Sequence, residues 1–141
     1  MRRGRALHRR YGRAFGQKVA ATTPEFEATL ARFVSSAQAM IDDHNDKFFA
    51  NARARVNDPS FGAKKLSLER GPKYIRVVVS DSYGDSKTGA GRSVYCFIDT
   101  TNGNILKSAS WKAPAKHARG NIFDADPLQG VTQYGAQYLR R

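Results

Sequence analysis

The segment at residues 92–111 constrains the fold more than any other, because its composition is that of a β-hairpin. Residues 93–99 (SVYCFID) are rich in β-branched and aromatic side chains, and residues 105–111 show the same bias less strongly. Between them lies Asn102-Gly103, the pair that best tolerates positive φ at both central positions of a type I′ turn. The sequence therefore predicts two antiparallel strands joined by a type I′ turn.

Residues 73–80 (KYIRVVVS) also have the composition of a strand. One predicted face is wholly apolar, whereas the other carries Tyr74 and Arg76 beside a valine, as expected for a sheet covered on one side only. Residues 67–69 are a weaker strand candidate. Residues 81–91 contain three glycines and few apolar side chains, so we expect a flexible connection there.

A long helix is predicted at residues 24–55. Thr23 can cap it, Pro24 suits its first position, and apolar side chains from Phe26 onwards recur every three or four residues. Helix propensity is poor at residues 42–46 (DDHND), so we expect a break near them. Metal binding is the other interpretation of this acidic segment, but His44 would point away from its neighbouring aspartates on a regular helix. We therefore predict no metal site.

The predicted fold class is α+β, with the long N-terminal helix packed on a three-stranded antiparallel sheet and a short C-terminal helix. The last helix is inferred from Asp126-Pro127 and from apolar residues spaced three or four apart after it. The predicted domain organisation is a disordered Arg-rich arm at residues 1–21 and one α+β domain at residues 22–141. Its core spans about residues 22–123, and residues 124–141 form a short C-terminal segment.

The net charge of +12, with a pI near 10.3, indicates a polyanionic partner, nucleic acid before an anionic membrane. Residues 1–20 contain seven cationic side chains and no acidic one. Arginine predominates, and its planar fork suits phosphate, so we interpret this arm as nucleic-acid-binding. A solvated tail or a targeting peptide is the alternative. The predicted binding residues of the arm are Arg2, Arg3, Arg5, Arg9, Arg10, Arg13 and Lys18.

A second basic surface follows the hairpin, in residues 111–119 (WKAPAKHAR), which we call the basic loop. Its cations are predicted to contact phosphate, together with Arg76 on the mixed strand face. Trp111 has two interpretations: core packing, which we favour for a lone tryptophan, and a platform for base stacking. The predicted binding residues here are Arg76, Trp111, Lys112, Lys116, His117 and Arg119.

Catalysis is not expected. The lone Cys96 lies in a predicted strand and is interpreted as a small core residue rather than a nucleophile. A metal-dependent nuclease would have to use Asp81, Asp85, Asp99 and His117, but two of these lie in the expected flexible connection. Asp99 begins a turn, where aspartate commonly makes local hydrogen bonds. No catalytic residue, metal or cofactor is therefore assigned.

Two stretches resemble proteins of single-stranded-DNA bacteriophages. The opening MRRGRALHRRYGRA is similar to the arginine-rich starts of small microvirus-like proteins. The segment SVYCFIDTTNGNILKSASWKAPAKHARGNIFD resembles a recurrent uncharacterised phage protein, marked by a Phe-Ile-Asp strand, a glycine turn and a WKAPAKxARGNI ending. The resemblance implies a small viral protein that handles or packages single-stranded DNA, and no catalytic residue is carried over.

The predicted function is therefore a non-enzymatic viral nucleic-acid-binding protein, with single-stranded DNA favoured and little dependence on sequence. One alternative is a structural virion or scaffold protein whose fold contacts protein and whose arm only neutralises genome; the nuclease is a second. Expected partners are nucleic acid and viral structural proteins, with a homo-oligomer left open and no membrane. The expected location is the host cytoplasm or the virion interior.

Overall fold

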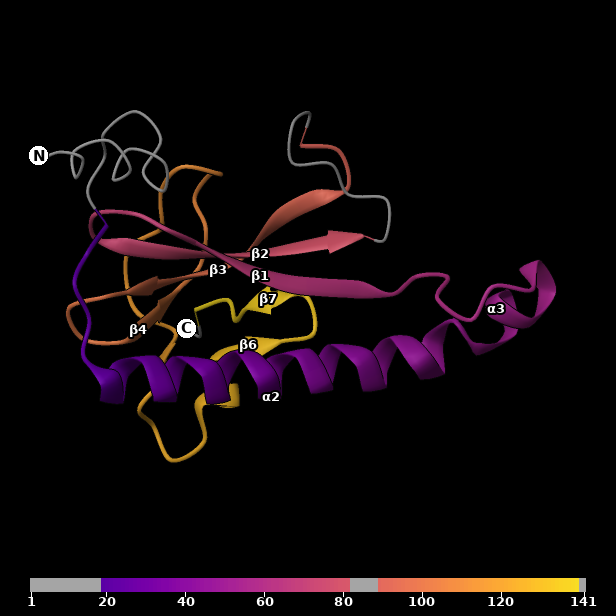
Figure 1. The fold of residues 1–141 in the computed structure, drawn as a ribbon, viewed down its shortest axis with the longest axis horizontal. Helices are drawn as coiled ribbons and strands as arrows, with labels where there is room; N and C mark the ends of the chain where they lie inside the picture. The colour runs from indigo at the N-terminus through magenta and orange to yellow at the C-terminus, as the bar shows by residue number, and fades with distance from the viewer. Residues whose placement is uncertain (1–18, 82–88, 140–141) are drawn as a thin grey trace, which may run out of the picture.

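The computed structural model describes residues 19–81 and 89–139, in which one long helix lies across one face of an antiparallel sheet (Figure 1). Helix α2 (Pro24–Phe48) runs along the sheet, and the short helix α3 (Ala50–Val56) extends beyond its end (Figure 1). The main sheet has five strands in sequential order: β1 (Lys64–Arg70), β2 (Tyr74–Asp81), β3 (Arg92–Asp99), β4 (Asn104–Leu106) and β5 (Gly120–Asn121). The 3-10 helix η1 (Pro127–Gly130) leads into a separate pair, β6 (Val131–Thr132) and β7 (Gly135–Ala136).

The predicted α+β class is confirmed, but the predicted three-stranded sheet with a short C-terminal helix is wrong. Strand β1 pairs with β2 along its full length, well beyond the candidate at residues 67–69. Strand β5 has only two residues and is held against β4, so its local composition gave no strand signal. Both additions depend on pairing with a neighbour rather than on intrinsic strand propensity.

Helix α2 begins as predicted. The backbone N–H of Phe26 donates a 3.0 Å hydrogen bond to the Thr23 hydroxyl oxygen, and Pro24 occupies the first turn. The helix continues through the DDHND segment, because the buried Asn45 still accepts a backbone hydrogen bond (2.9 Å) from Phe49. The break therefore falls at Phe49, just after the segment where it was expected.

The apolar stripe of α2 forms the core with the sheet, as the periodicity predicted. Phe33 is only 1% exposed and belongs to the same buried cluster as Ile75 and Cys96 of the central strands. Cys96 is fully buried, which confirms its role as a core residue, and burial raises the pKa of its thiol. At the sheet edge, the Gln38 side chain accepts from the Leu66 N–H and donates to the Lys64 carbonyl, which ties α2 to β1.

The β3–β4 hairpin is confirmed, but its second strand ends at Leu106 rather than near residue 111, and its turn is not type I′. Among described non-glycine residues only Asn57 and His117 have positive φ, so Asn102 does not adopt the predicted conformation. Gly103 does, with φ of 82°, and its N–H donates to the Asp99 carbonyl (2.7 Å). The connection is therefore a longer loop, in which the Asp99 carboxylate accepts from the Thr101 N–H.

The predicted C-terminal helix is replaced by η1 and the β6–β7 pair. Gly135 has a φ of 140°, and a side chain there would place its Cβ 2.7 Å from the Tyr95 carbonyl oxygen. Gly130 also lies close to Gly120: a Cβ built at Gly130 would be 3.1 Å from the Gly120 Cα. These glycines let the chain approach the sheet backbone, which a continuous helix would not do.

Candidate nucleic-acid interface

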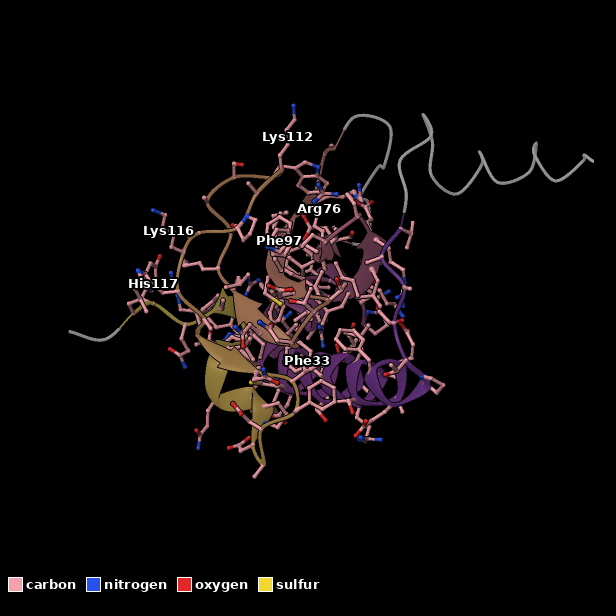
Figure 2. All side chains as sticks on the ribbon, turned by 90° about the vertical axis from the view of Figure 1, so that its left-hand side faces the viewer. Phe33, Arg76, Phe97, Lys112, Lys116 and His117 are labelled. Carbon is pink, nitrogen blue, oxygen red and sulfur yellow. The ribbon has the colours of Figure 1, made fainter. Side chains whose placement is uncertain are left out.

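The basic loop lies over the outer face of the sheet, by which we mean the side opposite α2. Glu69 of β1 pairs with Arg76 of β2, which pairs with Phe97 of β3, so these three side chains share one face. Figure 2 shows Arg76 and Phe97 on this outer side and Phe33 on the helix side. The mixed composition of β2 predicted a sheet covered on one side only, and this is wrong: the basic loop lies over the outer face, with Trp111 against Arg76 and with Phe97 buried.

An arginine–tryptophan cluster, made of Glu69, Arg76, Arg92 and Trp111, joins the sheet to the loop. Glu69 accepts hydrogen bonds from both arginines, 2.9 Å from Arg76 and 2.7 Å from Arg92. The guanidinium carbons of these arginines lie 4.7 and 5.5 Å from the Trp111 ring centre, within cation–π range. Arg76 also donates to the Trp111 carbonyl (2.8 Å). One carboxylate thus serves two arginines, and the cluster keeps one net positive charge.

The ionisation of Glu69 follows from these contacts. Burial by itself raises the pKa of its carboxyl group, but hydrogen bonds from Arg92 and Arg76, with their positive charges, lower it overall. Glu69 is therefore a carboxylate at neutral pH. Its negative charge is directed at the two arginines and adds little repulsion toward an approaching phosphate.

Trp111 is 39% exposed, so the favoured interpretation of it as a core residue is wrong. The indole ring is held by two guanidinium groups at the surface, with part of it open to solvent. Arg92 was not among the predicted site residues. In the strand register Arg92 lies opposite Ser80, which lies opposite Lys65, so it is only the long Arg92 side chain that reaches Glu69 (2.7 Å), and no local motif marks this contact.

The remaining cations of the basic loop differ in role. Lys112, Lys116 and His117 are exposed, and Figure 2 shows Lys112 and Lys116 pointing away from the body in different directions. The loop therefore spreads its cations rather than gathering them on one side. Arg119 instead braces the chain: it donates to the carbonyls of His117 (3.0 Å) and Gln137 (2.8 Å).

The residues considered for a nuclease do not converge. The Asp99 carboxylate accepts a hydrogen bond from Thr101 within its own turn. Asp81 forms an ion pair with Lys64, and Asp85 lies outside the described residues. In the described part of the chain, no group of three or more metal-ligating side chains could hold a metal ion. In the DDHND segment the carboxylates accept from neighbouring side chains, among them Lys47 and Arg53.

The predicted binding residues of the arm, Arg2, Arg3, Arg5, Arg9, Arg10, Arg13 and Lys18, lie outside the described residues. A comparison with known protein families shows where these arm residues lie relative to a family match. A family described as "Family of unknown function (DUF7717)" matches residues 17–135. The chain belongs to this family. The DUF7717 match includes the arginine–tryptophan cluster, the basic loop and Lys18, but not the six arm arginines.

No curated protein and no solved structure matches the chain. Within residues 19–81 and 89–139, no helix is both long and apolar enough to cross a membrane.

Proposed function

We propose that this protein binds nucleic acid without catalysing a reaction and with little dependence on sequence. The observation that carries the proposal is the solvent-exposed Trp111, held by Arg76 and Arg92 at the surface of a chain with a net charge of +12. Exposed aromatic rings bordered by cations are the usual elements of sequence-tolerant nucleic-acid binding, since every base has a face that can stack.

Phosphate contacts would supply most of the affinity. Lys112 and Lys116 are exposed, and in the part of the chain that the structure describes neither pairs with a carboxylate. Together with the arm, they offer charges that release counterions from a phosphate backbone. Single-stranded DNA is the favoured ligand, because Trp111 can stack only on a base that is not already paired within a duplex.

A viral context belongs to this proposal, supported by the resemblance of the arm and of residues 93–124 to phage proteins. In that context a structural role is the second candidate. It is favoured by apolar side chains exposed where α2 and α3 project beyond the sheet (Figure 1), with Phe48 70% and Val56 52% exposed. A protein that docks on its neighbours in a particle would use such a surface.

The test is a titration of fluorescent single-stranded and duplex oligonucleotides with three full-length proteins at several salt concentrations. One is the wild type, one has the six arm arginines changed to glutamine, and one carries Lys112→Gln and Lys116→Gln. For single strands, the slope of log K against log salt is about −0.7 per neutralised phosphate, so it counts contacts. The proposal expects both variants to bind more weakly with shallower slopes. No binding by the wild type would refute it.

If the arm variant loses all binding and the loop variant binds like the wild type, the folded domain is not a nucleic-acid binder. That result would favour the structural candidate, in which only the arm binds the viral genome. Incubation of labelled DNA with the wild type and Mg²⁺ tests the absence of catalysis, and cleavage abolished by Asp99→Ala would contradict it.

A further inference from the structure

A hollow of about 630 Å³ lies on the outer face, beside the arginine–tryptophan cluster. Its walls come from three separate segments: the β1–β2 turn with its flanking strand residues, which include Lys73 and Tyr74; Phe97 of β3; and Lys112 of the basic loop. Small-ligand sites commonly have volumes of roughly 300–1,000 Å³, so the hollow has room for one nucleotide.

Aromatic rings form one wall. The Tyr74 ring meets Phe97 edge-on, with ring centres 6.2 Å apart and planes at 70°. Phe97 is almost fully buried and fixes the position of Tyr74, which is itself half-buried and borders the hollow. Among the described residues the Tyr74 hydroxyl has no hydrogen-bond partner, so a ring-shaped ligand could pack on Tyr74 and hydrogen-bond to it.

The positive charge of the hollow rests on two lysines. Two wall arginines are already engaged with carboxylates: Arg76 with Glu69, and Arg70 with Glu27 through two 2.8 Å hydrogen bonds. Lys73 and Lys112 pair with no carboxylate in the described chain. Lys73 Nζ lies 5.3 Å from the Tyr74 ring centre, so a cation and an aromatic ring are presented together.

We propose that this hollow is a subsite for one unpaired nucleotide of a bound single strand. The base packs against Tyr74, and the adjoining phosphate lies between Lys73 and Lys112. A base within a duplex is stacked and paired, so it would have to leave the helix to enter. The inference rests on the proposed function and deepens it, because it makes the hollow the origin of a preference for single strands over duplex.

The experiment measures binding of fluorescent oligo(dT) and of a duplex of equal length to full-length variants. The test variants are Tyr74→Leu and the double variant Lys73→Gln/Lys112→Gln. The control is Lys65→Gln/Lys116→Gln, which removes two exposed lysines that do not line the hollow. A further variant, Tyr74→Phe, keeps the aromatic ring and removes only the hydroxyl group. Thermal unfolding is measured for every variant to check that the protein is folded.

We expect Tyr74→Leu to lose single-strand affinity by roughly 5-fold to 100-fold, the range for losing one stacked base, with duplex affinity changed much less. The double lysine variant loses a phosphate contact of this subsite, so its single-strand affinity should also fall more than its duplex affinity. The control should weaken both ligands by similar factors, and Tyr74→Phe should retain most single-strand binding. Intrinsic fluorescence gives a second readout, because the only tryptophan contacts Arg76 in the wall of the hollow. Thymidine monophosphate should change it saturably in the wild type, and inorganic phosphate should not.

The inference is overturned if the wild type binds oligonucleotides while the test variants keep its ratio of single-strand to duplex affinity. A fluorescence change with inorganic phosphate equal to that with thymidine monophosphate would also overturn it, since the hollow would then be a phosphate site. Absence of any oligonucleotide binding by the wild type is a different result, which defeats the proposed function itself.

Discussion

Arg76 contacts Trp111 twice: its guanidinium carbon lies 4.7 Å from the indole ring centre, and its Nε donates a 2.8 Å hydrogen bond to the carbonyl oxygen of the same residue. The arginine therefore fixes both the side chain and the backbone at the start of the basic loop. It is itself fixed by Glu69, which also binds Arg92. The position of the exposed tryptophan thus depends on a charge network anchored in three strands.

Arg76→Ala should release Trp111 from the sheet. Loss of a hydrogen bond to a charged group typically costs about 1.5–3 kcal/mol, so we expect the free energy of unfolding to fall by about that amount. Trp111 emission should shift to longer wavelength as the ring becomes more hydrated. Urea unfolding followed by tryptophan fluorescence measures both, with Lys112→Ala as the control that should change neither. Unchanged emission in Arg76→Ala would show that the loop holds the ring by itself.

Glu69 should make stability depend on pH. Its folded-state pKa is lower than the ordinary value of 4.5, so the ionised carboxylate stabilises the fold at pH above 4.5. That contribution is lost as pH falls through the folded-state pKa. Glu69→Gln should therefore be less stable than the wild type at pH 7, with the difference shrinking as pH falls below 4.5 and through the lower folded-state pKa. Chemical denaturation across this range measures it.

Glu27 should behave in the same way at the other face of the sheet. Hydrogen bonds from Arg70 and Thr22 lower the pKa of its carboxyl group below the ordinary value. Glu27→Gln should then lose its own share of the acid dependence, and the double variant with Glu69→Gln should be the least pH-sensitive. Equal acid sensitivity in all four proteins would show that neither carboxylate is responsible.

Thr23→Ala should destabilise the start of α2. The threonine hydroxyl accepts the Phe26 N–H at 3.0 Å, and removal of such a cap costs about 1 kcal/mol. Thr23→Ser keeps the hydroxyl and should lie close to the wild type in thermal unfolding. Equal loss in both variants would point to the threonine methyl group instead.

Gly135→Ala should be more disruptive than its small size suggests. The new Cβ would lie 2.7 Å from the Tyr95 carbonyl oxygen at a φ of 140°, so strain and collision combine, and we expect a loss of at least about 2 kcal/mol. Gly89→Ala is the matched control. Gly89 also has positive φ (78°) but meets nothing within 4 Å, so it reports the strain alone, about 1 kcal/mol. Equal denaturation midpoints for the two variants would contradict the collision.

The elements with strong local signals were predictable. The α2 cap at Thr23 and the apolar periodicity through Phe33 depend on residues within a few positions of one another. The β3–β4 hairpin was also predictable, whereas its turn was not, because the Asp99 side chain selects a longer loop over the Asn-Gly type I′ turn. The helix predicted for the last segment was wrong for a similar reason. The conformation of Gly135 is set by its contact with the Tyr95 backbone, 40 positions away, and not by its own neighbours.

The candidate site divides in the same way. Lys112 and Lys116 could be found from the sequence, since runs of cations without acids are visible in it. Glu69 and Arg92 could not be found, because their side chains meet across three strands at positions that are not opposite one another in the register. Arg119 was predicted to contact phosphate, and nothing in the sequence indicated that its guanidinium group donates to the backbone carbonyls of His117 and Gln137.

The α+β class, the long helix with its apolar stripe, the central hairpin and the excess of positive charge could all be predicted from the amino-acid sequence. These follow from short-range periodicity, propensity and composition, which act before the chain is folded. The exposure of Trp111 and the hollow bordered by Lys73, Tyr74 and Lys112 could be known only from the folded chain. Strand register and loop packing bring distant residues together, and no local pattern specifies which of them will meet.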